Sequence, residues 1–385
     1  TVSSRSGAPV AGAWVAVLRT SDFSIAGGGV ASGAGDFSVR VPAGSYYLYV
    51  VDGTGENASG FFGSPTLVEV AEGITVDVDP VVASNRGSVT ATVTEAPTGT
   101  GLGGVWGLAL SAGAGNTGAT EAVVSANGAG QMTLPGLRPG NHFVGFLDPT
   151  GAHATRFYPD TPDVAHATPV AVTAGGSTLA NASLPTQTPV GAGSTITGTL
   201  TETGTGAPIT DGRVVALRAS DYRIARAAVT NAAGQYTLQI AAGAYKLAFL
   251  DAGARHAMEW YDNLPNTGLG SAVSVIAPGT ANAALAPNTG TLSGTIVDDD
   301  SGSPIGGAWV VAIGPTGVTA GAVTGTDGTY RIAGLRPGSY RATIVDPEGG
   351  RAQEYFDDSA TYPGAATIEI SANTNRTIDA DLHRP

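Results

Sequence analysis

The sequence predicts an all-β protein made of four tandem β-sandwich domains in an elongated array, and three observations support this. The chain has 385 residues with 57 glycines and 23 prolines but only 13% charged residues, which favours short strands and turns over long helices. Apolar and small polar residues alternate in segments such as TITGTLTE (195–202) and YRATIVD (340–346), as in strands buried on one face. Finally, a set of landmarks recurs four times along the chain.

The recurring landmarks keep fixed spacings. Each copy has two adjacent aromatic residues, an aspartate nine residues before the first of them, and a tyrosine or histidine six residues before the aspartate. The aromatic pairs are Phe61-Phe62, Phe157-Tyr158, Trp260-Tyr261 and Tyr355-Phe356. The aspartates are Asp52, Asp148, Asp251 and Asp346, and the residues before them are Tyr46, His142, Tyr245 and Tyr340. Because both spacings hold without an insertion, we predict one structural unit repeated four times.

We predict four domains, here called repeats 1 to 4, at residues 1–83, 84–187, 188–288 and 289–385. Short segments with proline or glycine, such as VASNRG and APNTG, mark the boundaries and predict close neighbours along the array. Repeats 1 and 3 share RTSDFSIA and RASDYRIA, whereas repeats 2 and 4 share GLRPG. We infer that a two-domain module was duplicated.

Repeat 4 illustrates the expected order of strands. TLSGTIVD (291–298) predicts a first strand, PIGGAWVVAI (304–313) a second and GTYRI (328–332) a later one. The glycine turn RPGSY (336–340) then leads into the strand YRATIVD (340–346). Six or seven short strands at intervals of about ten residues, separated by Gly, Asn and Asp turns, are typical of a β-sandwich.

Charge and residue usage exclude several classes of function. The formal net charge is −13, so no basic stripe exists to neutralise nucleic acid or an anionic membrane surface. Cysteine is absent, which excludes disulfides and thiolate chemistry, and no apolar run approaches the roughly 20 residues that span a bilayer. No H-E-x-x-H, G-x-S-x-G or P-loop pattern occurs, so we do not expect an enzyme.

The repeated pattern resembles that of a known domain family. The segments GTIVDDDSGSPIGGAWVVAI (294–313) and GTDGTYRIAGLRPGSY (325–340) of repeat 4 resemble the carboxypeptidase regulatory-like, or transthyretin-like, domain family. They also look like the immunoglobulin-like B-type domains of bacterial pilins and adhesins. The resemblance implies a seven-stranded extracellular sandwich that serves as a spacer, stalk or accessory domain. It implies no catalytic residues.

The aromatic pairs are the first candidate site. Adjacent strand residues point to opposite faces, so one ring of each pair should enter the core and the other should face outward. We expect a structural role for both rings, with a sugar platform or an inter-domain contact as the alternative for the outward ring. Trp260 and Tyr261, next to Asp262 and Asn263, form the best glycan candidate.

Carboxylates form a second candidate site, for calcium. Asp298, Asp299 and Asp300 stand together in VDDDSGS, and Asp357 and Asp358 follow the last aromatic pair. Calcium prefers such oxygen ligands, although neither segment has the full spacing of a calcium loop. No other cofactor is expected. The four repeated aspartates are expected to hydrogen-bond the turns that follow them.

The third candidate is the first strand of repeat 1, which is truncated. Thr1-Val2 aligns with Thr295-Ile296, so about half of this strand is missing and the sheet edge beside it should be open. One interpretation is that preceding residues or domains complete it. The other is that a neighbouring subunit adds a strand there, which would make the chain a fibre subunit.

These observations together predict a non-enzymatic, extracellular repeat protein of a bacterial cell surface. We expect a stalk, a fibre subunit or an adhesive spacer, with polymerisation by strand complementation as one option. Its partners would be copies of itself or other surface proteins, and glycans are a further option. The alternative function is a carbohydrate-binding or accessory region of a secreted enzyme.

Overall fold

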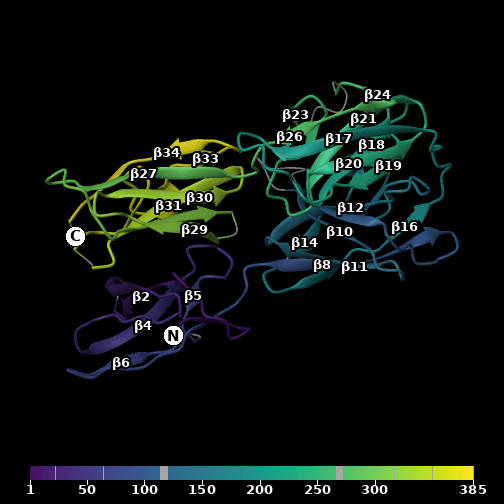
Figure 1. Ribbon diagram of the computed structural model, residues 1–385. Coiled ribbons are helices and arrows are strands. Elements are labelled where there is room, and N and C mark those ends of the chain that lie inside the picture. The colour runs from purple at the N-terminus through teal and green to yellow at the C-terminus, as the bar shows by residue number, and fades with distance from the viewer. Residues whose placement is uncertain are drawn as a thin grey trace. The chain divides into compact units, whose positions relative to one another are not determined.

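The computed structural model describes residues 1–21, 23–63, 65–112, 120–265, 272–315, 317–348 and 350–384, for position 265 the backbone alone. Its regular structure is almost entirely β, with several sandwich sheets, which confirms the predicted all-β class (Figure 1). The count of four domains stays a prediction. The helical elements described are two 3-10 turns, η1 (Val164–His166) and η3 (Tyr362–Gly364). None of the helices described is long and apolar enough to cross a membrane. The chain divides into two compact units, one of Thr1–Arg86 with Gly290–Pro385 and one of Gly87–Thr289.

The unit of residues 87–289 contains repeats 2 and 3, each with two sheets. Repeat 2 has one sheet of β9 (Trp106–Ser111), β10 (Thr120–Ser125), β12 (Gly140–Leu147), β13 (Arg156–Phe157) and β14 (Val170–Val172), and a second of β8 (Gly87–Ala96), β11 (Gln131–Leu137), β15 (Ser177–Leu179) and β16 (Ala182–Pro185). Repeat 3 has one sheet of β18 (Gly212–Arg218), β19 (Ile224–Val229), β21 (Gly243–Asp251), β22 (Glu259–Trp260), β23 (Leu264–Pro265) and β24 (Val275–Ala277), and a second of β17 (Ser194–Glu202), β20 (Gln235–Ile240), β25 (Gly279–Thr280) and β26 (Ala283–Leu285).

The other unit contains repeats 1 and 4. Repeat 4 has one sheet of β28 (Trp309–Gly314), β29 (Gly317–Val323), β31 (Gly338–Val345), β32 (Glu354–Tyr355) and β33 (Ile368–Ile370), and a second of β27 (Gly290–Asp298), β30 (Thr329–Leu335), β34 (Asn375–Thr377) and β35 (Ala380–Leu382). Repeat 1 has one sheet of β2 (Trp14–Arg19), β3 (Ile25–Val30), β4 (Gly44–Val51), β5 (Gly60–Phe61) and β6 (Val68–Val70), and a short pair of β1 (Ser3–Ser4) and β7 (Val81–Val82). The boundaries of the repeats stay predictions.

The first strand of each complete repeat has neighbours on both sides. In repeat 2, β8 pairs with β11 in antiparallel and with β15 and β16 in parallel register. β17 and β27 have the equivalent neighbours in repeats 3 and 4. The first and last strands of a repeat are therefore parallel neighbours, joined in repeats 2, 3 and 4 at Leu184–Glu95, Leu285–Glu202 and Leu382–Asp298.

Repeat 1 keeps only the second half of this strand. β1 pairs in parallel with β7, as the end of β8 pairs with β16. Residues 36–42 correspond to β30 and are described, but they form no strand. Phe37, Val39 and Val41 in this segment are partly buried against the core of repeat 1. These residues of DFSVRV therefore face the core alternately, as in a strand, but no strand among the described residues pairs with the segment.

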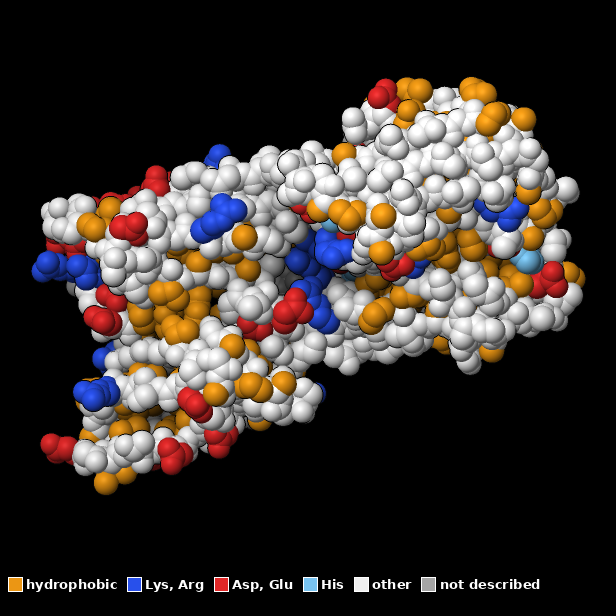
Figure 2. All heavy atoms as spheres, in the orientation of Figure 1, with side chains coloured by type: hydrophobic (Ala, Val, Ile, Leu, Met, Phe, Trp, Pro, Cys, Tyr) orange, Lys and Arg blue, Asp and Glu red, His pale blue; other side chains and the backbone are white. Residues whose placement is uncertain are grey.

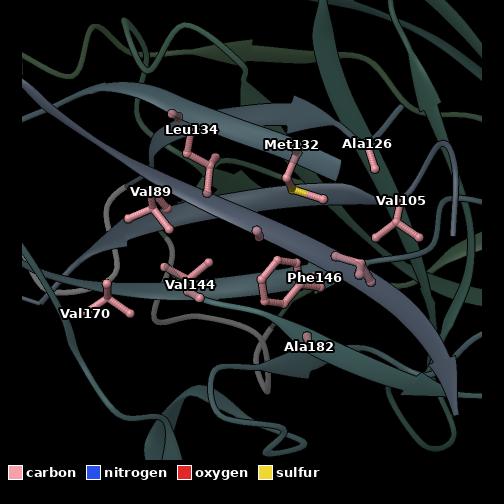
Figure 3. Packing of buried hydrophobic residues seen from close by; sticks show 14 of the residues in the cluster. Val89, Val105, Ala126, Met132, Leu134, Val144, Phe146, Val170 and Ala182 are labelled. Carbon is pink, nitrogen blue, oxygen red and sulfur yellow. The ribbon is translucent and has the colours of Figure 1, made fainter. Parts of the chain in front are cut away.

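Four clusters of buried residues fill the space between the paired sheets, one in each repeat. In repeat 2, Leu134 and Met132 of β11 point toward Val144 and Phe146 of β12 (Figure 3). Phe146 and Leu134 have no exposed surface. The alternation of β12 explains this arrangement, because residues two apart lie on the same face of a strand.

Some strands are buried on both faces, which alternation alone does not explain. In β2, Val15 and Val17 enter the core of repeat 1, while Trp14 and Ala16 on the opposite face belong to a separate buried cluster with residues of repeat 4. The continuous apolar runs WVAVL and WVVAI therefore mark strands with a second packing partner.

Candidate functional site

The candidate site in the unit of repeats 1 and 4 is the contact between two sheet faces. Its buried residues are Trp14, Ala16, Val51, Trp309, Val311 and Val345, three from each repeat. At its centre the rings of Trp14 and Trp309 stack with centroids 5.2 Å apart and an interplanar angle of 29°. An offset stack of this kind contributes roughly 0.5–1.5 kcal/mol beyond the burial of the rings.

Glycines on the facing strands make room for both indole rings. A Cβ atom on Gly321 of β29 would lie 2.4 Å from Cη2 of Trp14, and one on Gly28 of β3 would lie 2.8 Å from Cη2 of Trp309. Both distances are shorter than any tolerated carbon–carbon contact. Gly321 also donates its backbone N–H to the carbonyl of Gly53 at 2.7 Å. The two repeats thus contact each other reciprocally, each tryptophan covering a glycine of the partner.

The unit of repeats 2 and 3 contains an equivalent contact. The guanidinium of Arg213 lies over the ring of Trp106, 4.9 Å from its centroid. Around this pair, Val123 and Leu147 of repeat 2 pack with Val215 and Leu250 of repeat 3. A cation over an indole face is attracted by the ring quadrupole and replaces the stack of the other unit.

Strand register shows that the four planar groups occupy one position of the repeat. The residues opposite them across the sheet stand directly before the four repeated aspartates; the pairs are Trp14–Val51, Trp106–Leu147, Arg213–Leu250 and Trp309–Val345. The flanking hydrogen bonds recur as well: Ala227 N–H donates to the carbonyl of Pro149 at 2.8 Å, and Val123 N–H to that of Ala252 at 3.3 Å. Each contact therefore joins one copy of each sequence class, repeat 1 with 4 and repeat 3 with 2.

The aromatic pairs each place their second ring against the core of their own repeat. Phe62, Tyr158, Tyr261 and Phe356 are the partly buried residues that do so. Their N–H groups donate to the equivalent carbonyls of Leu48, Val144, Leu247 and Ala342 at 2.8–2.9 Å.

The first rings of the pairs lie on the other face and have different surroundings. Trp260 is 6% exposed and belongs to the buried cluster between repeats 2 and 3, so its ring is not available to stack on a sugar. Phe61 is 40% exposed and contacts the rings of Tyr47 and Tyr49 edge-on. Tyr355 contacts Tyr362 edge-on, and Phe157 is half-buried over Gly145.

The repeated aspartates are buried and hydrogen-bond the turns that follow them, as predicted. Asp52 accepts from the backbone N–H and hydroxyl of Thr54 at 2.9 and 2.7 Å, and Asp148 does the same with Thr150 at 2.8 and 2.7 Å. Asp251 accepts from Gly253 N–H at 3.0 Å, and Asp346 from Glu348 N–H at 3.0 Å. A carboxylate that satisfies the first N–H groups of a turn fixes the turn geometry.

Repeats 2 and 3 extend this aspartate into a carboxylate–histidine–carboxylate cluster. Nδ1 of His256 lies 2.8 Å from Asp251 and Nε2 lies 2.9 Å from Glu202. Because Glu202 ends β17 in one sheet and Asp251 ends β21 in the other, the imidazole connects the two sheets. His153 makes the same connection between Asp148 at 2.7 Å and Glu95 at 3.4 Å.

Hydrogen bonding lowers the pKa values of these carboxyl groups. His256 and Thr205 lower the pKa of Glu202, and Thr98 and His153 lower that of Glu95. Burial raises the pKa of Asp251, but the hydrogen bonds of Arg255 and His256 outweigh it and hold the pKa below the ordinary value of 3.8. Asp148 behaves in the same way with His153 and Thr150.

The other two repeats vary the same position, five residues after the aspartate. Repeat 4 has Arg351, which is bonded to Asp298 at the end of β27 and lies 3.8 Å from Asp346. In repeat 1, Asn57 donates to Asp52 at 2.9 Å, and Ser4 stands where the other repeats have the second acid. A hollow of about 610 Å³ lies there, lined by residues that include Ser4, Asp52 and Asn57.

The predicted calcium ligands have mixed surroundings. Ser301 and Arg351 hydrogen-bond Asp298 and lower its pKa to about 2, and Asp300 pairs with Arg384 at 3.1 Å. Asp299 pairs with His383 at 2.9 Å. Asp357 and Asp358 are exposed and have φ angles of 70° and 54° in a left-handed turn.

The first two residues of the chain pair within repeat 1. Val2 has no exposed surface, and its N–H donates to the carbonyl of Gly35 at 2.8 Å. The amino group of Thr1 lies 2.8 Å from Asp79.

Comparison with known proteins supports the resemblance for one repeat. Residues 291–383 match the family model of the carboxypeptidase regulatory-like domain, which confirms the resemblance predicted for repeat 4. A comparison with curated proteins finds no match.

Solved structures similar to the chain include three from bacteria. The Bacillus anthracis TIE protein has 13% identity, with 97% of this chain and 69% of that chain covered and a TM-score of 0.27. The minor pilin GBS52 of Streptococcus agalactiae has 15% identity and a TM-score of 0.28, and the match covers 50% of this chain and 96% of that chain. The major pilin SpaD of Corynebacterium diphtheriae has 12% identity and a TM-score of 0.23, and the match covers 78% of this chain and 97% of that chain. With TM-scores below 0.3, these likenesses say nothing about what this chain binds.

Surface charge agrees with the low content of charged residues. Figure 2 shows one face on which backbone and uncharged side chains predominate, with acidic and basic side chains in small groups. The net charge is negative, and the visible face has no extended basic surface to which a polyanion could bind.

Sequence reasoning missed the residues that join the repeats, although two signals were present. A tryptophan begins the second strand in three of four repeats, in GAWVAVL, GVWGLAL and GAWVVAI. A polar residue also stands five positions after each repeated aspartate, as Asn57, His153, His256 and Arg351. Neither signal reveals the facing tryptophan or arginine or the acid on the first strand, because these partners lie far away in the sequence.

Gly321→Ala should weaken the contact between repeats 1 and 4, because its Cβ would overlap Trp14. Overpacking of this kind costs about 1–3 kcal/mol. We expect a lower unfolding temperature by calorimetry and faster proteolysis. Gly33→Ala is the matched control, since a Cβ there meets nothing within 4 Å. Equal stability of the two variants would contradict the contact.

His256→Asn should reduce the acid sensitivity of repeat 3. The asparagine should keep a hydrogen bond to Asp251, as Asn57 does to Asp52 in repeat 1, but it should lose the hydrogen bond that His256 makes with Glu202. Because the folded-state pKa values of both acids are lowered, their stabilisation is present above the ordinary values of 3.8 and 4.5 and is lost as pH falls through the lowered values.

The measurement is the unfolding temperature of wild type and variant between pH 7 and pH 3. The variant should be less stable at pH 7 and should lose less stability on acidification. His166→Asn is the control, because His166 and Asp163 are exposed. Parallel pH profiles for wild type and His256→Asn would refute the assignment.

Proposed function

We propose that the protein is a non-enzymatic structural component of a bacterial cell surface, a stalk, fibre subunit or spacer that carries tension. The observation that carries this proposal is the parallel pairing of the first and last strands in the repeats. Tension on the two ends of a repeat pulls such neighbours in opposite directions along their length. The hydrogen bonds between them are then loaded together in shear instead of opening one after another.

The sheet-to-sheet clusters support the same role. The carboxylates at the ends of β8, β17 and β27 belong to the strand that takes up tension first. Through His153, His256 and Arg351 they are fastened to the opposite sheet. Charge-assisted hydrogen bonds are stronger than neutral ones, so they stabilise the loaded strand against sliding.

The same clusters favour a structural role over catalysis. In the two histidine clusters described above, both ring nitrogens face carboxylates. Thr150 and Thr98 donate to the other oxygens of Asp148 and Glu95. Gly253 N–H and Thr205 donate to those of Asp251 and Glu202. Groups that satisfy one another in this way are not free to activate a nucleophile or to transfer a proton to a substrate. The cluster recurs in the repeats while the residue five positions after the aspartate varies, which is typical of a structural role.

Force spectroscopy tests the proposal, because a cysteine-free chain can be pulled through chosen cysteine pairs. Ser194→Cys with Ala286→Cys places the handles at opposite ends of β17 and β26 and loads them in shear. Ser194→Cys with Thr280→Cys places both handles at the first end of the parallel pair β17 and β25 and peels these strands apart.

We expect the first pair to require a higher unfolding force than the second in the otherwise unchanged chain. Equal forces in both directions would contradict a tension-bearing role. Turnover of a substrate by the purified chain, lost on His256→Ala, would contradict the non-enzymatic part of the proposal.

Polymerisation by strand complementation belongs to this proposal, with repeat 1 as the acceptor. In repeat 4, residues 290–295 of β27 pair with β30. The equivalent place in repeat 1, beside residues 36–42, is where a further strand would add. On its other side, Ile74 is 60% and Val76 39% exposed. Apolar side chains next to an unpaired edge are suited to a strand from another chain or from a segment before Thr1.

A labelled peptide with the sequence of residues 290–295 should bind the chain, measured by fluorescence polarisation. The control peptide carries proline in place of Leu292 and Gly294, which removes two backbone donors. Binding of both peptides alike, or of neither, would contradict strand addition.

A further inference from the structure

Repeat 4 contains a group of three potential metal ligands that has no counterpart among the described residues of the other repeats. Glu354 lies on β32, Asp358 in the turn after it, and His383 directly after β35. One ligand atom from each can be chosen so that all three lie within 4.8 Å of one another. Among the described residues this is the group that brings three such ligands together.

The buried state of Glu354 is the observation that points to a ligand. This residue is only 6% exposed, and its Oε1 atom has no hydrogen-bond partner. An unpaired buried carboxylate oxygen costs free energy unless a cation or a donor reaches it.

Repeat 3 shows how the same position is satisfied without a cation. Glu259 is the equivalent of Glu354, since both pair with the same position of the long central strand, Phe249 and Ile344 respectively. Oε1 of Glu259 accepts a hydrogen bond at 3.2 Å from the backbone N–H of Ala286, which is equivalent to His383. In repeat 4 His383 stands at that position, and Oε1 of Glu354 has no hydrogen-bond partner.

A carboxylate holds the histidine in place. Nδ1 of His383 lies 2.9 Å from Asp299. Histidines that bind metals usually donate one ring N–H to a carboxylate, which fixes the ring and directs the other nitrogen toward the ion. Asp299 therefore serves as a positioning residue, and Nε2 of His383 is the nitrogen that remains for an ion.

We propose that Glu354, Asp358 and His383 bind one divalent transition-metal ion of the zinc class. Imidazole with two carboxylates suits Zn²⁺, whereas Ca²⁺ selects oxygen ligands alone. The ion would join the edge strand β32, the turn after it and the segment after the last strand β35. This inference does not depend on the mechanical role proposed above.

The matching positions in repeats 1 and 2 explain why the site is confined to repeat 4. Where repeat 4 has Glu354, repeat 2 has Arg156 and repeat 1 has Gly60. Repeat 3 keeps the acid but has Asn263 and Ala286 in place of Asp358 and His383. One ion per chain follows from this comparison.

The experiment is a calorimetric titration of untagged, EDTA-treated full chain with ZnCl2, with CaCl2 in parallel. We expect one Zn²⁺ per chain, a higher unfolding temperature in its presence, and no comparable effect of Ca²⁺. Glu354→Gln and His383→Ala should each weaken Zn²⁺ binding about 10- to 100-fold or more. Glu259→Gln is the matched control and should bind like wild type.

Four outcomes would overturn the proposal. These are no Zn²⁺ binding by the wild type, unchanged binding in Glu354→Gln or His383→Ala, equal loss in Glu259→Gln, or Ca²⁺ binding at equal strength that survives His383→Ala. Circular dichroism of each variant in EDTA distinguishes lost ligands from lost fold. Glu354→Gln preserves shape and removes the buried charge, so this variant should remain folded.

Discussion

The contact of two planar side chains across facing sheets constrains much of the structure around it. Trp14 and Trp309 stack at the centre of one unit, and Arg213 lies over Trp106 at the same position of the other. For these groups to meet, the strands that carry them must be apolar on both faces. The strands opposite must offer a small residue, as Gly28 and Gly321 do. One interaction thus explains both the apolar runs and the glycines of these strands.

The replacement of a tryptophan by Arg213 shows which property of the position matters. A guanidinium is flat, stacks on an aromatic face and keeps its charge, so it can occupy the site of an indole ring without a cavity. A lysine or leucine there would lose the planar contact. The two units therefore share the geometry of their contact and differ in its chemistry.

A second constraint acts within each repeat, at the aspartate that follows the central strand. Its carboxylate is buried in all four repeats and needs donors. The nearest turn supplies backbone donors, and the residue five positions on supplies a side chain that in repeats 2, 3 and 4 also reaches an acid on the first strand. The repeated aspartate, which keeps its spacing in all four repeats, is therefore part of the connection between the two sheets.

Much of the fold could be predicted from the sequence, because it depends on local patterns. Alternation, turn residues and the repeated spacings identify the strands, and the aspartate of VDPEGG was expected to bond its turn. The pairing of repeat 1 with repeat 4 could not be predicted, because Trp14 and Trp309 are separated by almost 300 residues and nothing near either tryptophan identifies the other. Of the proposed metal ligands, Asp358 was an expected ligand and Glu354 lies four residues before it, whereas His383 comes from a separate segment that no local pattern connects to them. The acidic run VDDDSGS predicted Asp298 and Asp300 as ligands, but both have arginine partners.

The face-to-face contact of repeats 1 and 4 is tested most directly by a distance measurement. Spin labels at Thr20→Cys and Thr326→Cys, exposed positions of repeats 1 and 4, can be read by pulsed electron resonance in the intact chain because no native cysteine competes. We expect one narrow distance distribution that broadens when Trp14 and Trp309 are both replaced by alanine. A broad distribution in the otherwise native chain, unchanged by those replacements, would contradict it.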